Sequence, residues 1–595
     1  MLRSLSSALL ASAIAVVVAL GAATPASALT IYTVNGHVTD ATTGLPIAGV
    51  CIIIGPPAAC PPTAPMTDAS GNWTTQLISG ADWDVWYSKT GYTLVKQTIP
   101  ASNTTDPYVL TIALTPAPVT PPPGTCTTAS TQTPIQTVYL PNITKMLGGA
   151  TGWQTPFIVQ NTSASATTTL EVSFFRFSDG SCVTRRTITG VGPGTSFADV
   201  PNNDADLPAD TQFSVVVRSF GSSIVSVVNE HNSFGARAEA LSYDGFSSGA
   251  VSVSLPNIVR RFFGFHTPFI MQNLGTAATT ATATFLPFNG GGSVTIQRTI
   301  QPGQSQFIEP NVEAVLQDGT QYAVTVTANQ PLAVVVNTHN DDANVASPVA
   351  YATDGVSAGA ATVYGPYAAK NANDLGFTGT ISTIVVQNVG AAPVTPTLTF
   401  TPLGGGTSKT FTSASALAPG TSWAFDPRYE NGASASGVLC GSAATTPCLA
   451  DGEYSFVAAA PGAIAAAVNV VSPTTAMGYT ALTRAATSFF LPNVTRTLGG
   501  ANGWTTPILL QTASASGASI AWRRFSDGQL VTTQSLTITA GSGVRIDPRA
   551  VAALSDDTQY AVTVTGVGGS VAAIVTELNG QGGDGAMTYE GFAAP

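Results

Sequence analysis

The chain has 595 residues, of which 44% are hydrophobic and only 9% are charged, and its formal net charge at pH 7 is -11. This length exceeds that of one domain, and the hydrophobic content excludes a disordered chain. An acidic chain without a basic cluster does not fit a protein that binds nucleic acid or anionic membranes through charge, so no nucleic acid partner is expected.

Residues 1–28 have the features of an export signal. Arg3 provides a positive start, an uncharged apolar run extends from Ala8 to Gly21, and Ala26-Ser27-Ala28 offers the small residues of a cleavage site. We predict cleavage between Ala28 and Leu29 and export to the cell exterior, either released or associated with the cell envelope. A membrane anchor is the alternative, but the run is shorter than the about 20 apolar residues of a bilayer span, so no span is expected in the mature chain.

Residues 29–114 are predicted to form a first domain of short strands and tight turns. Glycines, turn residues and apolar residues follow one another in a dense order, namely Gly36, Val38, Asp40, Thr43-Gly44, Pro46, Gly49-Val50, Thr67-Asp68, Gly71, Trp73, Gly80, Val85 and Gly91-Tyr92. This pattern resembles the carboxypeptidase regulatory-like domain family over about residues 31–114. The resemblance implies a transthyretin-like β-sandwich that accompanies catalytic or surface domains and is not itself an enzyme, although Trp73 and Trp83 stand where tyrosine or phenylalanine is more usual.

The aromatic residues of this domain raise the question of carbohydrate binding. Related sandwiches include carbohydrate-binding modules, which is an analogy of fold alone. Side chains alternate along a strand, so Trp83 and Tyr87 share one face while Trp86 lies on the other. Trp86 is therefore the candidate for carbohydrate contact, and packing in the core is the competing interpretation. Residues 115–125, with five prolines, are predicted to be a semi-rigid linker.

The remaining chain repeats one pattern four times, over residues 126–249, 250–360, 361–485 and 486–595. The copies share an apolar-Pro-Asn step, a Gly-containing hairpin turn, a Pro-Gly-x-Ser turn and a Gln-Asn pair. The pair stands at Gln160-Asn161, Gln272-Asn273 and Gln387-Asn388, with Gln511-Thr512 in the fourth copy. About seven short alternating strands per copy, separated by turn residues, predict antiparallel sandwiches.

The predicted fold class is therefore all-β, with tandem antiparallel sandwiches. The copies resemble uncharacterised immunoglobulin-like β-sandwich repeats of bacterial exported proteins, and that resemblance says nothing of activity. Each copy is long enough to bury a core of its own, so we expect an elongated array of separately folded modules.

Six cysteines in an exported chain are expected to form disulfides. Proximity favours the pairs Cys51–Cys60 and Cys440–Cys448, which leaves Cys126 and Cys182 for each other, although six cysteines allow 15 pairings. Cys440 and Cys448 lie in a stretch that the third copy has in addition to the others. Metal binding or catalysis by these cysteines is the disfavoured alternative, because no C-x-x-C spacing occurs.

Two motifs could suggest catalysis. Gly355-Val356-Ser357-Ala358-Gly359 matches the nucleophile elbow of hydrolases, which requires a preceding strand and a following helix. The first copy has a similar stretch at the same place, which favours a linker turn between modules. His231 and His339 are equivalent residues on separate modules, so a solvated strand end is favoured over a shared metal ion. No catalytic residue and no metal ligand is predicted.

Calcium is the cofactor that the sequence leaves open. Asn202, Asn203, Asp204, Asp206 and Asp210 place oxygen ligands at short spacing, and Asn340-Asp341-Asp342 does the same. Polar turns are the competing interpretation, since Asp and Asn bond to their own backbone in turns.

These features predict a secreted, non-enzymatic surface or extracellular-matrix protein for adhesion, spacing or polymer binding. Its partners would be an extracellular polymer or protein, with polysaccharide among the candidates. The alternative is a carbohydrate-binding accessory protein that acts through the first domain.

Overall fold

The structure is a computed structural model that describes residues 30–594 apart from 42–45, 56–59, 62–63, 90–91, 104, 116–125, 127, 150, 233–237, 342–344, 375–376, 444–446 and 581–583. The predicted cleavage site at Ala28 and Leu29 and the linker core therefore lie outside the described residues. The chain divides into two compact units, Met1–Pro122 and Pro123–Pro595. Within the described ranges the fold is all-β, with antiparallel sandwiches and no α-helix.

The N-terminal unit is a sandwich of two three-stranded sheets, with strand orders β3-β1-β6 and β2-β4-β5. Its strands are β1 (Ile31–Asp40), β2 (Cys51–Ile54), β3 (Asn72–Ile78), β4 (Trp83–Ser88), β5 (Val95–Ile99) and β6 (Tyr108–Leu114). β1 runs antiparallel to β3 and parallel to β6. The Trp73 ring lies in the core over Gly36, where a Cβ atom would come within 1.9 Å of the indole, so this position requires glycine.

Each repeat is a sandwich of two sheets. In the first repeat the orders are β10-β9-β12-β7 and β11-β8-β13-β14, and in the fourth they are β33-β32-β35-β30-β38 and β34-β31-β36-β37. The first repeat comprises β7 (Gln136–Lys145), β8 (Phe157–Asn161), β9 (Thr168–Arg176), β10 (Cys182–Val191), β11 (Ser196–Asp199), β12 (Thr211–Ser219), β13 (Ile224–His231) and β14 (Ala240–Asp244). The fourth comprises β30 (Ser488–Arg496), β31 (Ile508–Thr512), β32 (Gly517–Arg524), β33 (Leu530–Thr537), β34 (Gly543–Ile546), β35 (Thr558–Gly566), β36 (Val571–Leu578), β37 (Ala586–Glu590) and β38 (Phe592–Ala593).

In the second and third repeats one long strand crosses both sheets and joins them, namely β20 and β28. The second repeat comprises β15 (Ala250–Arg260), β16 (Phe269–Asn273), β17 (Thr279–Pro287), β18 (Val294–Ile300), β19 (Ser305–Ile308), β20 (Thr320–Asn340) and β21 (Val349–Asp354). The third comprises β22 (Ala360–Lys370), β23 (Ala372–Asp374), β24 (Phe377–Asn388), β25 (Thr397–Pro402), β26 (Lys409–Thr412), β27 (Ser422–Phe425), β28 (Gly452–Val471) and β29 (Ala476–Thr480). Short 3-10 helices are η1 (Pro201–Asn203), η2 (Pro310–Val312), η3 (Glu430–Gly432), η4 (Ser434–Ser436) and η5 (Pro548–Ala550).

The apolar-Pro-Asn step interrupts the first strand of a repeat. The register of β7 against β12 shifts between Leu140 and Ile143, as in a β-bulge. In the gap Asn142 donates its backbone N–H to the Tyr243 hydroxyl (3.0 Å), which donates in turn to the backbone oxygen of Asn142 (2.6 Å). Tyr589 and Asn493 repeat this exchange in the fourth copy. The motif thus fixes the last strand of a repeat onto its first.

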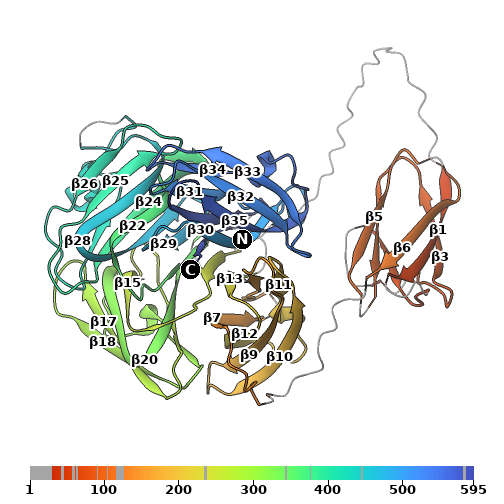
Figure 1. Ribbon diagram of the computed structural model, residues 1–595, viewed down its shortest axis with the longest axis horizontal. Coiled ribbons are helices and arrows are strands. Elements are labelled where there is room, and N and C mark those ends of the chain that lie inside the picture. Colours follow the sequence, from red (N-terminus) through yellow and green to blue (C-terminus); the bar gives the residue numbers. More distant parts are fainter. Residues whose placement is uncertain are drawn as a thin grey trace, which may run out of the picture. The chain divides into compact units, whose positions relative to one another are not determined.

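The four repeats close into a ring (Figure 1). The hairpin turn of each repeat meets the Pro-Gly-x-Ser turn, or its counterpart, of the next. Gln304 Nε2 of the second repeat donates to the Phe177 backbone oxygen of the first (2.6 Å), and a Cβ atom at Gly420 of the third repeat would lie 3.1 Å from Leu286 of the second. The backbone N–H of Gly404 in the third repeat donates to the Gly543 oxygen of the fourth (2.8 Å), and that of Ser196 in the first donates to the Phe525 oxygen of the fourth (3.3 Å). One head-to-tail contact used four times closes the assembly on itself.

The Gln-Asn pair serves this ring and the local fold. The glutamine side chain reaches the preceding repeat: Gln272 donates to the Val215 oxygen (3.5 Å), Gln387 to the Val324 oxygen (3.4 Å) and Gln511 to the Phe456 oxygen (3.1 Å). The asparagine stays within its repeat, where Nδ2 of Asn273 donates to the oxygens of Ala277 and Ile300. Both side chains are buried, so their polar groups require these partners.

The expectation of an elongated array of separate cores is wrong for the repeats. Side chains of neighbouring repeats share their apolar clusters: Ile270, Val335 and Ala350 of the second repeat pack with the core of the first, and Ile158 and Val227 of the first pack with the core of the fourth. The physical reason is that the sheets of a repeat have apolar residues on both faces in β8, β16 and β31, whose residues are all buried. Each repeat therefore depends on its neighbours to cover the second face.

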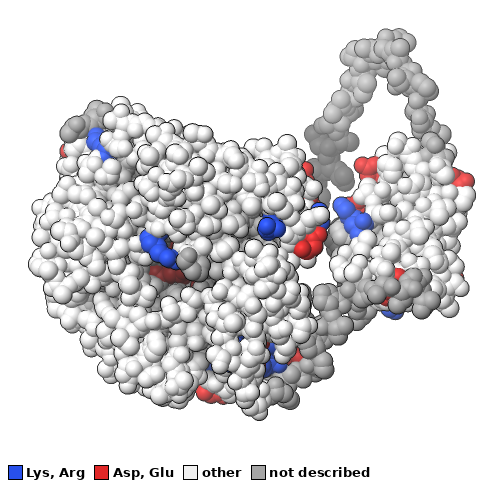
Figure 2. All heavy atoms as spheres, viewed as in Figure 1, with Lys and Arg blue, Asp and Glu red and all other residues white. Residues whose placement is uncertain are grey.

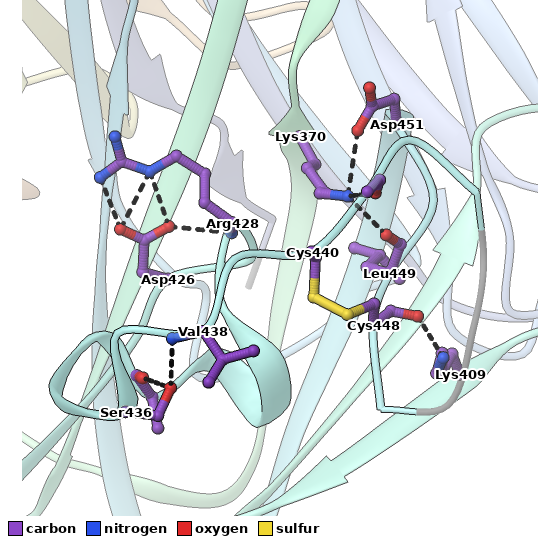
Figure 3. The surroundings of a disulfide bond; sticks show 12 residues. Lys370, Lys409, Asp426, Arg428, Ser436, Val438, Cys440, Cys448, Leu449 and Asp451 are labelled. Carbon is purple, nitrogen blue, oxygen red and sulfur yellow. Dashed lines mark hydrogen bonds and ion pairs between the residues drawn. A yellow bond between two sulfur atoms is a disulfide. The ribbon is translucent and has the colours of Figure 1, made fainter.

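The disulfides join Cys51 to Cys60, Cys126 to Cys182 and Cys440 to Cys448, the pairs that proximity favours. The last of these closes the additional loop of the third repeat (Figure 3). Beside it the fully buried Lys370 amine donates to the backbone oxygens of Gly441 (2.5 Å) and Leu449 (2.7 Å) and pairs with Asp451 (3.0 Å). The disulfide thus closes the insertion on itself, and the buried Lys370 amine fastens the insertion to the sandwich.

Candidate functional site

One strand near the end of every repeat lies on the axis of the ring. These strands are β14, β21, β29 and β37, and each contacts its two neighbours around the axis. Equivalent alanines stand at or next to their first positions, namely Ala240, Ala350, Ala476 and Ala586, all buried. The alternation of a strand sends one set of side chains, such as Tyr243, into the core of its own repeat and the small set toward the axis. Gly478 shows how close the strands lie, since a Cβ atom there would be 2.3 Å from the Tyr351 ring.

A ring of polar residues ends these strands. The equivalent positions are Asp244, Asp354, Thr480 and Glu590. Asp354 donates its backbone N–H to the Thr480 hydroxyl (2.8 Å), and the backbone N–H of Thr480 donates to the Glu590 carboxylate. Backbone N–H groups of Glu590 and Asp244 act in the same way on the carboxylates of Asp244 and Asp354. Each repeat thus donates to the next, and the cycle returns to its start.

Three carboxyl groups, one buried and two partly buried, therefore lie close together. One ligand oxygen from each of Asp244, Asp354 and Glu590 lies within 4.8 Å of the others. Burial, and then the charges of the neighbouring carboxylates, hold the pKa values of Asp244 and Asp354 well above their usual range. Burial likewise raises the pKa of Glu590 to about 7, against hydrogen bonds from Thr480. Perturbed groups gathered in one place are a mark of functional sites.

A pocket of about 530 Å³ opens over this cluster. Asp354, Thr480 and Glu590 contribute to its lining, together with residues of the loops between repeats. The loop residues include Ser247, Ser357 and Arg484, whereas Phe489 and Phe490 come from β30 and Phe592 from β38. The pocket is of a size that suits small ligands or an inserted side chain.

Asp584 holds the opposite end of the axial strands. Its carboxylate accepts from the backbone N–H of Ala350 in the second repeat (2.6 Å) and of Ala476 in the third (3.1 Å). Its own N–H donates to the Ala238 oxygen of the first repeat (2.8 Å). Burial holds the pKa of this carboxyl well above its usual range. One residue of the fourth repeat thereby binds all three others.

The equivalent histidines lie in different surroundings. His231 is close to Gln154 Nε2 (3.3 Å), whereas His339 Nδ1 lies 3.3 Å from Glu239 of the first repeat and stacks on His266. Burial alone would lower the pKa of His339, but the hydrogen bond and charge of Glu239 raise it above the usual value. Glu239, His339 and Asp341 form a second cluster with metal-ligand geometry. The two histidines do not share a site, which agrees with the interpretation favoured from the sequence. His339 is not at a solvated strand end, however, which differs from that interpretation.

The acidic stretches singled out for calcium serve as turns and pairs. Asp204 is buried and pairs with Arg186 (2.8 Å), and its Oδ1 accepts from Asp206 N. Asn202 Oδ1 accepts from Met146 N, and Asp210 Oδ1 from Gly148 N. Asp341 belongs to the cluster of His339, and Asp342 lies outside the described residues. These side chains are engaged in local structure, which fits the polar-turn interpretation.

Ser357 stands in the loop between β21 and β22 and is exposed. A strand follows it, whereas a nucleophile elbow requires a helix at that point. The sequence nevertheless contained the signal of the axial ring here. Asp244-Gly245-Phe246 and Asp354-Gly355-Val356 are equivalent, and Thr480-Ala481-Leu482 and Glu590-Gly591-Phe592 complete that series. Asp584 gave no comparable pattern, because its counterparts are not acidic.

Trp86 of the N-terminal unit is half-buried and not exposed as a platform. The Lys96 amine lies 5.5 Å from the centre of its ring. Trp73 and Tyr87 are in the core, with ring centroids 5.9 Å apart, and Trp83 packs against it. No cluster of exposed aromatic rings therefore accompanies Trp86 among the described residues of this unit.

No protein-family model and no curated protein matches this chain. Among solved structures, the major pilin subunit BcpA of Bacillus cereus aligns at 12% identity over 47% of this chain and 88% of its own, with a TM-score of 0.13. A DUF3823 family protein from Parabacteroides merdae aligns at 9% identity over 34% of this chain and 90% of its own, with a TM-score of 0.11. The Bacillus anthracis TIE protein aligns at 11% identity over 49% of this chain and 48% of its own, with a TM-score of 0.12. Alignments with TM-scores this low carry no argument about function.

The described residues include no helix with the length and apolar character that a bilayer crossing demands. Charged side chains are also sparse on the face of the four-repeat unit drawn in Figure 2. Recognition at this face would therefore depend on shape, hydrogen bonds and a few charges.

Proposed function

We propose that the chain is an exported, non-enzymatic binding protein of the cell surface or extracellular matrix, and that its binding site lies on the four-repeat ring. The pocket on the axis carries this proposal. Its lining combines phenylalanine rings from β30 and β38 and Glu590 from β37 with serine hydroxyls and Arg484 from loops that differ between repeats. Variable loops on a rigid scaffold are a usual location for recognition sites.

The repeated motifs support a binding role over catalysis. The Gln-Asn pair, the Pro-Asn step and the Pro-Gly-x-Ser turn all pack or bond within the ring, so their recurrence reflects assembly. The closed ring also argues against the repeats as a stalk or spacer, because they do not extend from end to end. Adhesion or polymer binding remains the better interpretation of the two.

The pocket can be tested by filling it. Ser357→Trp introduces a large side chain at an exposed position of the lining, and Ser434→Trp, in the exposed loop of the third repeat, is the matched control. Binding of the full chain to immobilised polysaccharide and protein fractions of the source envelope is measured for both. We expect Ser357→Trp to weaken binding at least about tenfold and Ser434→Trp to leave it unchanged. Equal binding by wild type and Ser357→Trp would rule out the pocket.

For the N-terminal unit we propose a carboxypeptidase regulatory-like sandwich that accompanies the ring. Carbohydrate binding through this unit remains the alternative function, with Trp86 as its contact, and the half-buried ring under Lys96 gives it little support. A glycan array with the full chain and with Trp86→Ala tests it. Retention that depends on Trp86 would favour the alternative, whereas no retention would remove it.

The non-enzymatic assignment has a separate test. A broad panel of esterase and glycosidase substrates should show no turnover by the full chain. Turnover that Ser357→Ala abolishes would contradict the assignment and would reopen the pocket as an active site.

A further inference from the structure

We propose that Asp244, Asp354 and Glu590 bind a calcium ion on the axis of the ring. The ion would join the first, second and fourth repeats at the point where their last strands meet. This inference does not depend on the proposed function, since the ion would act in the assembly of the ring whether or not the pocket above it binds a partner.

The spacing of the ligand atoms suits calcium. Three carboxylate oxygens lie within 4.8 Å of one another, and each comes from a different repeat. Calcium binds oxygen ligands at about 2.3 to 2.6 Å, so small adjustments of the side chains would let one ion between them reach all three. Magnesium requires about 2.0 to 2.1 Å in near-octahedral geometry, and zinc favours nitrogen and sulfur ligands, neither of which the three residues offer.

Unpartnered oxygen atoms provide a second and independent observation. Oδ1 of Asp244 and Oδ1 of Asp354 are both shielded from solvent, and neither has a hydrogen-bond partner among the described residues. A buried polar atom without a partner is costly, and a buried carboxylate is more so. A cation between the two aspartates would satisfy both atoms at once.

The charges around the cluster favour a cation as well. None of the three carboxylates forms an ion pair with a lysine or arginine in the described part of the chain, although other buried carboxylates do, such as Asp204 with Arg186. The cluster opens into the pocket through Asp354 and Glu590, so water can complete the six to eight ligands that calcium takes. The Thr480 hydroxyl already donates to the backbone oxygen of Asp354 (2.8 Å) and is not needed as a ligand.

Calorimetry and thermal unfolding of the full chain test the site. The protein is freed of metal with a chelator, and calcium chloride is added alone, with magnesium chloride in a parallel series. We expect calcium to bind with a Kd of about 10⁻⁴ M or tighter and to raise the Tm of the ring, with a weaker response to magnesium. No response to calcium at millimolar concentration, or an equal response to both ions, would overturn the assignment.

Variants locate the ion. Asp354→Asn and Glu590→Gln keep the shape of the side chains and remove one charge each, and we expect either to weaken calcium binding at least about tenfold. Without calcium, Asp354→Asn should be at least as stable as wild type, because it relieves repulsion between like charges. With calcium the order should reverse.

Two control variants make the result specific. Asp179→Asn changes an exposed hairpin carboxylate, and Asp341→Asn changes the second cluster with His339 and Glu239. Both should retain the calcium response of wild type. Loss of the response in Asp341→Asn with retention in Asp354→Asn and Glu590→Gln would place the ion elsewhere and refute the proposal.

Discussion

The N-terminal sandwich and the repeats bury their apolar side chains in different ways. The core of the N-terminal sandwich, around Val34, Trp73 and Tyr87, contains residues of that sandwich alone. The cores of the repeats cross from one copy to the next, so Ile270 of the second repeat belongs to the core of the first. The same architecture is self-sufficient in one region and dependent on neighbours in the other.

Strand patterns show what this difference requires. In β6 of the N-terminal sandwich, buried and exposed residues alternate, as in a sheet with one solvent-exposed face. In β8, β16 and β31 every residue is buried. A sheet with two apolar faces needs a cover on each, and only a closed ring provides that cover for all four repeats.

Separating the regions should produce the largest effect. A fragment of residues 29–122 should unfold in one cooperative transition, because its core is complete. A fragment of residues 250–360 should show no cooperative transition, because Ile270, Val335 and Ala350 lose the partners that the first repeat supplies. Circular dichroism melts and size-exclusion chromatography of both fragments measure this. A second repeat that melts cooperatively as a monomer would contradict the account of shared cores.

Removal of the Asp584 carboxylate should weaken the ring and spare the N-terminal sandwich. Asp584→Ala leaves the buried N–H groups of Ala350 and Ala476 without acceptors, which we expect to cost roughly 3 kcal/mol. Asp584→Asn retains one acceptor and should cost less. Differential scanning calorimetry of the full chain should show a lower Tm for the ring alone. An equal shift in both variants would show that the two hydrogen bonds are not the cause.

The smallest effect is the change in stability over one pH unit. Burial raises the pKa of Glu577 to about 8 at the junction of the fourth and first repeats, where Asn493 and Asn229 donate to it. The folded ring therefore holds a proton that the unfolded chain loses near pH 4.3, so its free energy of unfolding should fall as pH rises between about 4.3 and 8. The slope from this group is at most about 1.4 kcal/mol per pH unit.

Glu577→Gln should flatten this dependence in urea unfolding at pH 5 to 8. Asp179→Asn is the control, since hydrogen bonds from Ser181 lower the pKa of Asp179 and it titrates below that range. A Gln variant with the slope of wild type would exclude Glu577 as the source.

Much of the local structure could be predicted from the sequence. Alternation and turn residues indicated the sandwiches, and the spacing of the cysteines indicated which of them pair. The ring could not be predicted, because alternation shows which residues share a face but not what covers that face. Gln272 illustrates the limit: its recurrence was visible, but its partner Val215 lies in another repeat. The acidic cluster could not be predicted for a similar reason. Asp244, Asp354 and Glu590 are distant in sequence and meet only when the ring closes.

Head-to-tail closure also sets the number of copies. In an open solenoid a repeat can be gained or lost at an end, because the remaining units keep their neighbours. Here the turn of Ser526-Asp527-Gly528 already abuts Pro193 of the first repeat, so a fifth copy has no free surface on which to dock. Loss of one copy would leave two half-covered sheets facing water. Duplication and deletion, the usual route by which repeat proteins change length, would therefore be selected against in this chain.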